Sequence, residues 1–193
     1  MKIHSNVLAK EEHERLVKYI TSNGFQWSYN NATYDASDKT DTPQMVRSLM
    51  ERRHIEDWSD EPSLWTSHQF YHKYFWQIPH LHDILKNCDV EGKYWRIKCN
   101  LLQPYPNAPE HHPYHVDVDN SDWQPPGGFT SYIYYINDSD GCTWFENGGK
   151  VEPIANTCIE FDSYIKHASS NPTNGPRYII NFVVANTERT LRI

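Results

Sequence analysis

His115 and Asp117 are two residues of metal-ligating type separated by a single valine. They lie within residues 113–119, where apolar and polar side chains alternate as they do in a half-buried strand. Side chains at positions i and i+2 of a strand face the same side, so the imidazole and the carboxylate are expected to point together. With a second histidine from elsewhere in the chain they would form a two-histidine, one-carboxylate triad, which leaves positions open on iron(II).

Other histidines are weaker candidates for such a site. His54 and Glu56 have the same spacing, but they lie in a charged stretch without strand alternation, which is typical of a solvated face. His111 and His112 are close to the first pair in sequence but belong to a proline-rich loop, so we do not expect them to be ligands.

The second half of the candidate site follows a strand-like stretch at residues 157–161. His167 is the last histidine of the chain, and Arg177 follows it ten residues later at the start of an apolar stretch. A buried charge needs a partner, and a planar guanidinium can hold a carboxylate through two parallel hydrogen bonds. Arg177 is therefore a candidate for the far end of a dicarboxylate that chelates a metal at its other end. The alternatives are a turn role for His167 and an ion pair of Arg177 with Glu160 or Asp162.

The order of these residues resembles the iron(II)- and 2-oxoglutarate-dependent oxygenases, in particular their prolyl hydroxylase-like branch. The likeness covers residues 97–184 and extends beyond the candidate ligands to four further motifs. These are Q-P-Y-P-N at 103–107, I-Y-Y-I-N at 133–137, G-C-T-W-F at 141–145 and F-D-S…H…P-T-N-G-P-R from 161 to 177, beside the family patterns Y-P-G-N, I-Y-Y-L-N, G-G-x-T-x-F and F-x-S…H…P-x-x-x-G-x-R.

The resemblance implies a fold, an activity and a set of roles. The fold is a double-stranded β-helix, a cupin-like jelly roll that is mainly β with N-terminal helices. The activity is that of a dioxygenase that hydroxylates a C–H bond and converts 2-oxoglutarate to succinate and CO2, with iron(II) as the metal and ascorbate as a candidate supporting reductant. The implied site residues are His115, Asp117 and His167 as iron ligands, Arg177 on the distal carboxylate of 2-oxoglutarate with Tyr135 as its hydroxyl partner, and Tyr105 in contact with the co-substrate.

Two positions depart from the family pattern. A tryptophan often stands six residues after the arginine, where this chain has Val183, and Cys142 replaces a usual glycine. Val183 would widen the pocket, which puts a prolyl substrate in question. Asn181 shares a strand face with Arg177, so it either contacts the site or makes a hydrogen bond at the end of the strand.

The sequence leaves the substrate open. We expect a peptidyl proline or another protein side chain. A small-molecule or amino-acid hydroxylase of the same superfamily is the alternative within this class. A metal-binding jelly roll without oxygenase activity is the rival from another class, and Arg177 argues against it because such a module has no need for 2-oxoglutarate.

These residues need a β-rich framework to position them. From residue 94 onward, short stretches rich in aromatic and β-branched residues are separated by turn sequences, which predicts a sandwich or barrel. We expect one domain over residues 1–193, with a helical and loop support layer at 1–92 and the jelly-roll core at 93–187. Helices are expected at 8–22, 45–58 and 78–88, and strands at 25–29, 94–103, 129–137, 142–145, 157–161 and 177–186.

Two further stretches invite a functional interpretation. Residues 65–76 carry several aromatic rings, which are expected to cover a sheet, with a wall of the substrate site as the alternative. Residues 118–128 contain Trp123, two prolines and two glycines. That composition suits either a hinged flap over a bound substrate or an ordinary solvated loop.

Composition limits the functional classes. The chain has 193 residues and a net charge of −7, which argues against nucleic-acid binding because that depends on clustered Lys and Arg. The sequence contains no apolar run of membrane-spanning length and no signal-peptide core at its start, so we expect a cytoplasmic protein without a membrane partner. No C-x-x-C pair is present, and the cysteines are expected to be buried, reduced thiols. The oligomeric state stays open.

Overall fold

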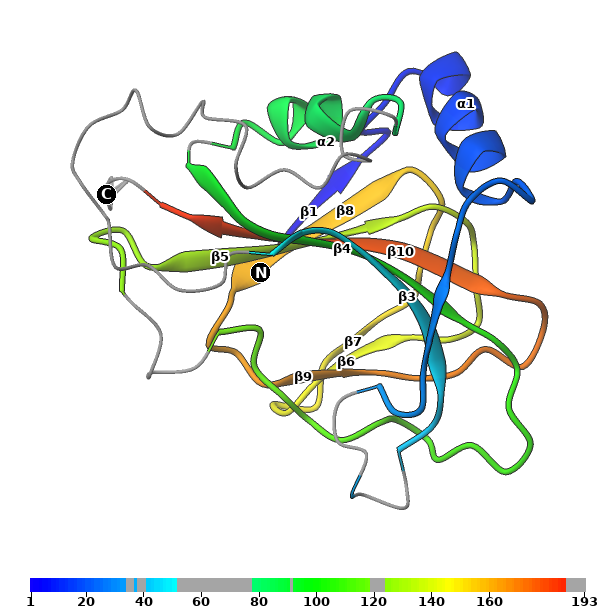
Figure 1. The fold of residues 1–193 in the computed structure, drawn as a ribbon. Helices are drawn as coiled ribbons and strands as arrows, with labels where there is room; N and C mark the ends of the chain where they lie inside the picture. The colour runs from blue at the N-terminus through cyan, green and yellow to red at the C-terminus, as the bar shows by residue number, and fades with distance from the viewer. Residues whose placement is uncertain (34–36, 38–40, 52–77, 91, 119–123, 187–193) are drawn as a thin grey trace.

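Two antiparallel sheets and two helices make up the part of the chain that the computed structural model describes, which is residues 1–33, 37, 41–51, 78–90, 92–118 and 124–186. Neighbours in the seven-stranded sheet are, in order, β1 (Lys2–Ser5), β8 (Thr157–Asp162), β5 (Phe129–Tyr135), β10 (Arg177–Ala185), β4 (Lys93–Leu102), β3 (Gln44–Glu51) and β2 (Ser28–Asn30). The three-stranded sheet has the order β7 (Lys150–Val151), β6 (Thr143–Phe145) and β9 (His167–Ser169). The helices are α1 (Lys10–Ile20) and α2 (Leu81–Asn87), and Figure 1 shows them on one side of the large sheet and the small sheet on the other.

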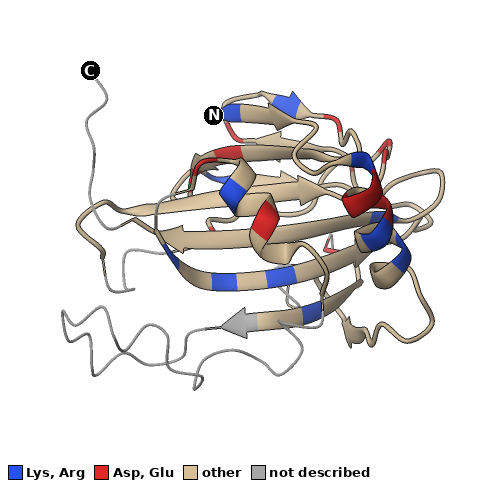
Figure 2. Ribbon diagram, turned by 90° about the horizontal axis from the view of Figure 1, so that it is seen from above, with Lys and Arg blue, Asp and Glu red and all other residues tan. Residues whose placement is uncertain are grey.

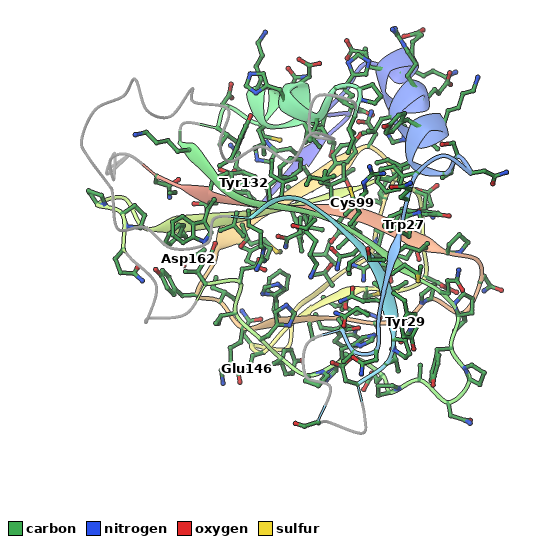
Figure 3. The ribbon with its side chains drawn as sticks, in the orientation of Figure 1. Trp27, Tyr29, Cys99, Tyr132, Glu146 and Asp162 are labelled. Carbon is green, nitrogen blue, oxygen red and sulfur yellow. The ribbon has the colours of Figure 1, made fainter. Side chains whose placement is uncertain are left out.

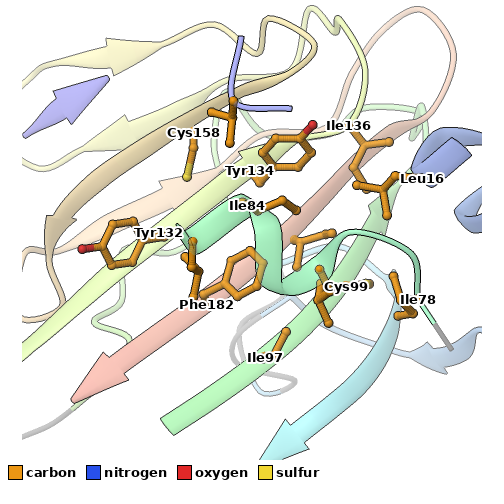
Figure 4. Packing of buried hydrophobic residues seen from close by; sticks show 14 of the residues in the cluster. Leu16, Ile78, Ile84, Ile97, Cys99, Tyr132, Tyr134, Ile136, Cys158 and Phe182 are labelled. Atoms are coloured by element: carbon orange, nitrogen blue, oxygen red, sulfur yellow. The ribbon is translucent and has the colours of Figure 1, made fainter. Parts of the chain in front are cut away.

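Alternation along the central strands gives the large sheet one apolar face. Ile97 and Cys99 of β4 and Tyr132 of β5 point toward the helices, where they join a buried core with Ile84 of α2 (Figure 4). Figure 3 shows Cys99 and Tyr132 on this helix side, whereas Glu146 lies on the side of the small sheet. Each large apolar side chain that is buried here contributes about 1.5–3 kcal/mol, so this face supplies much of the folding free energy.

The residues between these apolar positions face the small sheet. They include Arg96, Lys98 and Asn100 on β4, and Arg177 and Asn181 on β10, all of which line one cavity. Polar side chains in the middle of a sheet are costly to bury unless they find partners. The two-residue period of the strands therefore separates an apolar core from a polar cavity, and the cavity holds the candidate site.

The segment that carries His115 and Asp117 is extended but is not a regular strand, although its alternation predicts one. A single bridge pairs His115 with His167 of β9 through two backbone hydrogen bonds, each of 2.9 Å. The N–H of Asp117 donates to the carbonyl oxygen of Ser163 at 3.1 Å. The segment thus runs along β9 as an irregular extra strand, and its two candidate ligands both reach the cavity.

Most of the predicted elements are confirmed within a few residues, but the helix expected at 45–58 is wrong where the structure describes it. The charges of that stretch suggested an exposed helix, whereas β3 pairs with β4 in the large sheet. Three strands of this sheet, β1, β2 and β3, come from the first 92 residues, where only one strand, at 25–29, was expected. The division of the chain at residue 92 stays a prediction, and the aromatic stretch 65–76 lies outside the described residues.

Charged residues are spread widely over the fold. Figure 2 shows segments with Lys or Arg interspersed with segments with Asp or Glu over the helices, and further basic segments on strands of the large sheet.

Neither described helix is long and apolar enough to cross a membrane. The free thiols of Cys88, Cys99, Cys142 and Cys158 are all buried, as the sequence predicts.

Gly141 opens the G-C-T-W-F motif and lies against the backbone after β9. A Cβ at this position would stand 2.7 Å from the carbonyl oxygen of Ser170 and 2.9 Å from the nitrogen of Pro172. We expect Gly141→Ala to cost roughly 1–3 kcal/mol, as overpacking does in a well-packed core. This cost would lower the thermal unfolding midpoint by several degrees. In the control Gly24→Ala, the new Cβ meets only the Ser22 hydroxyl at 3.8 Å, and the midpoint should stay nearly unchanged. Equal midpoints for the two variants would contradict the prediction.

Candidate metal centre

His115, Asp117 and His167 come together at one end of the cavity. One potential ligand atom from each residue lies within 4.8 Å of the others, and this set is the only such group in the described part of the chain. Nε2 of His167 lies 3.6 Å from Oδ2 of Asp117, and the centroids of the two imidazole rings are 4.5 Å apart. Two imidazoles and one carboxylate at this spacing form a donor set that suits iron(II).

Backbone carbonyls orient both histidines. Nδ1 of His167 lies 3.0 Å from the carbonyl oxygen of Ile165, and Nδ1 of His115 lies 3.4 Å from that of Pro113. Because a carbonyl oxygen can only accept, each Nδ1 carries the proton and each Nε2 presents its lone pair. The ring of Phe161 packs edge-on against His167 with 4.8 Å between centroids, which fixes the imidazole plane.

The carboxylate of Asp117 is buried among donors. The hydroxyl of Ser131 donates to Oδ2 at 2.6 Å, Nδ2 of Asn181 donates to the same oxygen at 3.2 Å, and Arg96 forms an ion pair with Oδ1. Burial alone raises the pKa of Asp117, but the charge of Arg96, the two imidazoles and the Ser131 hydrogen bond outweigh it and hold the pKa well below its usual range. The ligand is therefore ionised at neutral pH.

His115 is held in its neutral form. Burial lowers the pKa of His115 to about 4, and the neighbouring His167 acts in the same direction while Asp117 opposes it. Metals bind the unprotonated imidazole, so no proton has to be displaced from His115 near pH 7.

Arg177 lies fully buried at the other end of the cavity. Its Nη2 donates to Oγ1 of Thr143 at 2.8 Å, whereas Nε and Nη1 are buried without a hydrogen-bond partner. Burial lowers the pKa of the guanidinium and Tyr135 opposes this shift, but an arginine remains charged at neutral pH. Buried donors are nearly always paired in native proteins, so two unpaired donor nitrogens on one charged side chain call for an acceptor such as a carboxylate.

Thr143 and Tyr135 complete this end of the cavity. The Tyr135 hydroxyl donates to Oγ1 of Thr143 at 2.9 Å, so this oxygen accepts from both Tyr135 and Arg177. With both acceptor positions filled, the hydroxyl proton of Thr143 is left to donate, and Thr143 lines the cavity. Burial raises the pKa of Tyr135 to about 12, although Arg177 opposes the shift, so the phenol stays protonated and keeps its donor role.

A single cavity of about 130 Å³ connects the two ends. Its lining includes the three candidate ligands, Thr143 and Arg177. An elongated dicarboxylate could therefore place one end among the candidate ligands and the other against the unpaired guanidinium N–H groups.

Some residues predicted for the site lie elsewhere. Tyr105 is 48% exposed and does not line the cavity, so the structure does not bring it together with the candidate ligands. The Tyr135 hydroxyl is directed at Thr143, and its contact with a co-substrate stays a prediction. Val183 packs in a small core with Val118 and Phe129 instead of lining the cavity.

The remaining predictions are settled in part. Asn181 contacts the site through Asp117, which was one of its two expected roles. His112 is fully buried and bonded through Nδ1 to Asp41 at 2.8 Å, which accounts for it without a metal. His54 and Trp123 lie outside the described residues.

Three residues with a role at the site were not predicted as site residues. Thr143 belongs to the G-C-T-W-F motif, so the family resemblance of that motif could have pointed to it as a site residue. Arg96 had a weaker signal, because β4 alternates polar residues with Ile97 and Cys99, and inward polar positions on a central strand indicate a site. Ser131 gave no signal that separates it from an ordinary strand serine.

No family model and no curated protein match the chain. Solved structures do match. The viral collagen prolyl hydroxylase of Paramecium Bursaria Chlorella virus-1, solved with 2OG, is 14% identical over 95% of this chain and 94% of that chain, with a TM-score of 0.56. A Trichoplax adhaerens prolyl hydroxylase, solved with a hypoxia inducible factor oxygen degradation domain peptide fragment, is 17% identical over 100% and 86%, with a TM-score of 0.56. The non-heme alpha ketoglutarate dependent epimerase SnoN from nogalamycin biosynthesis is 11% identical over 95% and 77%, with a TM-score of 0.57.

At these identities the likeness defines the fold. The chain is a jelly roll of the double-stranded β-helix type, the fold of prolyl hydroxylases and other 2OG-Fe(II) oxygenases. The predicted fold class, mainly β with N-terminal helices, is confirmed.

Proposed function

We propose that the chain is an iron(II)- and 2-oxoglutarate-dependent dioxygenase that hydroxylates a C–H bond. One observation carries this proposal: a two-histidine, one-carboxylate group and a fully buried arginine with two unpaired donor nitrogens line the same cavity. The two histidines and the carboxylate would bind a metal. The arginine would bind the second, distant carboxylate of a co-substrate. The fold shared with 2OG-Fe(II) oxygenase structures supports the same assignment.

The residues have separate tasks in this reaction. His115, Asp117 and His167 would hold iron(II), and Arg177 with Thr143 would bind the distal carboxylate of 2-oxoglutarate. Bound iron supplies the redox chemistry that couples oxidative decarboxylation to hydroxylation of a substrate C–H bond, with O2 consumed and succinate and CO2 released. The protein orients the co-substrate along the cavity and keeps water away from it, because the lining side chains are mostly buried.

An anaerobic titration tests this function. Iron(II) and then 2-oxoglutarate are added to the metal-free protein, and the weak visible charge-transfer band expected for this class is recorded. Air is then admitted, and succinate is measured. A band that requires both additions, followed by succinate formation, supports the proposal. A protein that binds iron(II) but gives no band and no succinate would instead be a metal-binding jelly roll without oxygenase activity.

For the prime substrate we propose a peptidyl proline or another protein side chain. The structural neighbours include prolyl hydroxylases, and one of these was solved with a peptide fragment. The packing of Val183 in a separate core removes the reason to expect a pocket widened at that position.

A small-molecule or amino-acid substrate is the alternative, and it is favoured by one observation. An epimerase from nogalamycin biosynthesis has the same fold with a comparable TM-score. Proline-containing peptides and free amino acids can be compared by the succinate that they add to the slow substrate-free level. Stimulation by free amino acids alone would exclude the peptide assignment.

A further inference from the structure

Arg96 contacts both the side chain and the backbone of the candidate metal ligand Asp117. Its Nη2 forms an ion pair with Oδ1 of the carboxylate, and its Nη1 donates to the backbone carbonyl oxygen of the same residue at 3.3 Å. Nη2 also donates to Oδ1 of Asn181 at 3.3 Å. Nδ2 of Asn181 in turn donates to the Asp117 carboxylate. These contacts to both the side chain and the backbone fix the orientation of Asp117 and stabilise its negative charge.

The two oxygens of Asp117 consequently have different surroundings. Oδ1 faces the guanidinium of Arg96. Oδ2 accepts from Ser131 at 2.6 Å and from Nδ2 of Asn181 at 3.2 Å, and it lies 3.6 Å from Nε2 of His167, so it is the oxygen on the side of this histidine. A metal ion among the three ligands would meet Oδ2, whose hydrogen bonds come from neutral donors, while Oδ1 is held more strongly by the charged guanidinium of Arg96.

We propose that Arg96 is a positioning residue that keeps Asp117 a one-oxygen ligand and thereby keeps a coordination position free for a 2-oxo acid. Carboxylates bind metals through one oxygen or through both. The triad is useful for oxygenase chemistry only if three positions stay open, because a chelating 2-oxo acid fills two of them and O2 needs another. A second bond from Oδ1 would close one of these positions. The inference rests on the proposed function.

The position of Arg96 in the fold fits this role. It lies on the inward-facing row of β4 with Lys98 and Asn100, and its side chain is 27% exposed, so its replacement leaves the apolar core on the helix side untouched. Asp117 also keeps its bonds to Ser131 and Asn181 when Arg96 is changed. A purely structural ion pair would be expected to affect folding and metal binding first, whereas a positioning role affects the open coordination positions first.

The test compares Arg96→Met with the wild type under anaerobic conditions. Iron(II) affinity is measured by competition with a metal indicator, and 2-oxo acid affinity by titration of the charge-transfer band. We expect Arg96→Met to bind iron(II) at least as tightly as the wild type, because a cation beside the ion has been removed. It should need about tenfold more 2-oxo acid for the same band, which is the lower end of the loss of activity expected when a group that orients a metal ligand is removed.

Affinities for two different 2-oxo acids distinguish the role of Arg96 from that of Arg177. 2-Oxopentanoate has the chain length of 2-oxoglutarate but lacks the distal carboxylate. Arg96→Met should weaken both acids by the same factor, because it acts at the chelating end that they share. Arg177→Met should weaken 2-oxoglutarate alone. Arg96→Lys keeps the charge but offers a single donor nitrogen in place of the planar guanidinium, so we expect an intermediate loss, and this variant provides the test if Arg96→Met does not fold.

The outcomes distinguish this inference from the proposed function. A wild-type protein with no band would overturn both. A wild-type band together with unchanged 2-oxo acid affinities in both Arg96 variants would overturn the positioning role and leave the proposed function standing. Loss of iron(II) binding in both variants, with lowered unfolding midpoints, would show that the ion pair is structural and would likewise overturn it.

Discussion

Replacement of His167 by alanine is expected to weaken iron(II) binding by roughly tenfold or more, because it removes one of the three candidate ligand atoms outright. The side chain of His167 is 4% exposed, its Nδ1 donates to the carbonyl oxygen of Ile165, and its Nε2 faces Asp117. No other described histidine or acid stands close enough to take its place. His115→Ala and Asp117→Ala should lose iron(II) to a similar degree. Competition with a metal indicator under anaerobic conditions measures each loss.

The matched control for these variants is His82→Ala. His82 belongs to α2 on the helix side of the sheet, and its Nδ1 bonds to the hydroxyl of Tyr94. Its removal should leave iron(II) affinity at the wild-type level. His112 is a poor control because its buried bond to Asp41 ties down the segment just before His115. Iron(II) binding by a folded His167→Ala protein at wild-type strength would remove the triad from consideration.

The sequence predicts the central strands well, and the three candidate ligands do lie together in the structure. β4, β5, β8 and β10 are long or buried enough that hydrophobic alternation is visible in the chain itself. The same period puts Arg177 and Asn181 on one face, and the structure shows both on the cavity side. The pairing of His115 and Asp117 on a common side survives even though their segment is only an irregular strand.

The predictions that failed concern residues whose contacts lie far away in the sequence. Gln44 and Arg47 are polar residues of β3, which covers the start of the stretch 45–58 where a helix was expected, and both are buried. Gln44 accepts a hydrogen bond from Nδ2 of Asn100 at 2.6 Å, and the guanidinium of Arg47 stacks over Phe25 at 4.4 Å. Neither partner is near in sequence, so no local pattern reveals that these polar side chains are buried.

The contacts of the site were hidden for the same reason. The sequence offers Tyr135 as a partner for the distal carboxylate, but it does not show that Thr143 stands between the Tyr135 hydroxyl and Arg177. It also gives no sign that Arg96 is an ion-pair partner of Asp117, because the two residues are joined only by the packing of β4 against the loop after it. Such pairings are properties of the fold.

Replacement of Arg177 by methionine is expected to weaken 2-oxoglutarate binding while iron(II) affinity stays nearly unchanged. A charge-assisted hydrogen bond contributes about 1.5–3 kcal/mol, which corresponds to roughly 10- to 150-fold in affinity. Arg177 offers Nε and Nη1 for this purpose, because both are buried and unpaired. Methionine fills similar space without a charge, so the change removes the carboxylate partner with little loss of packing.

The charge-transfer band again provides the measurement, with 2-oxopentanoate as the reference ligand. If Arg177 binds the distal carboxylate, the wild type should prefer 2-oxoglutarate strongly and the variant should bind both acids about equally. Retention of the wild-type preference would mean that Arg177 does not contact the co-substrate. A parallel loss of iron(II) binding would mean that the arginine supports the fold through Thr143, since it would then act on both ends of the cavity at once.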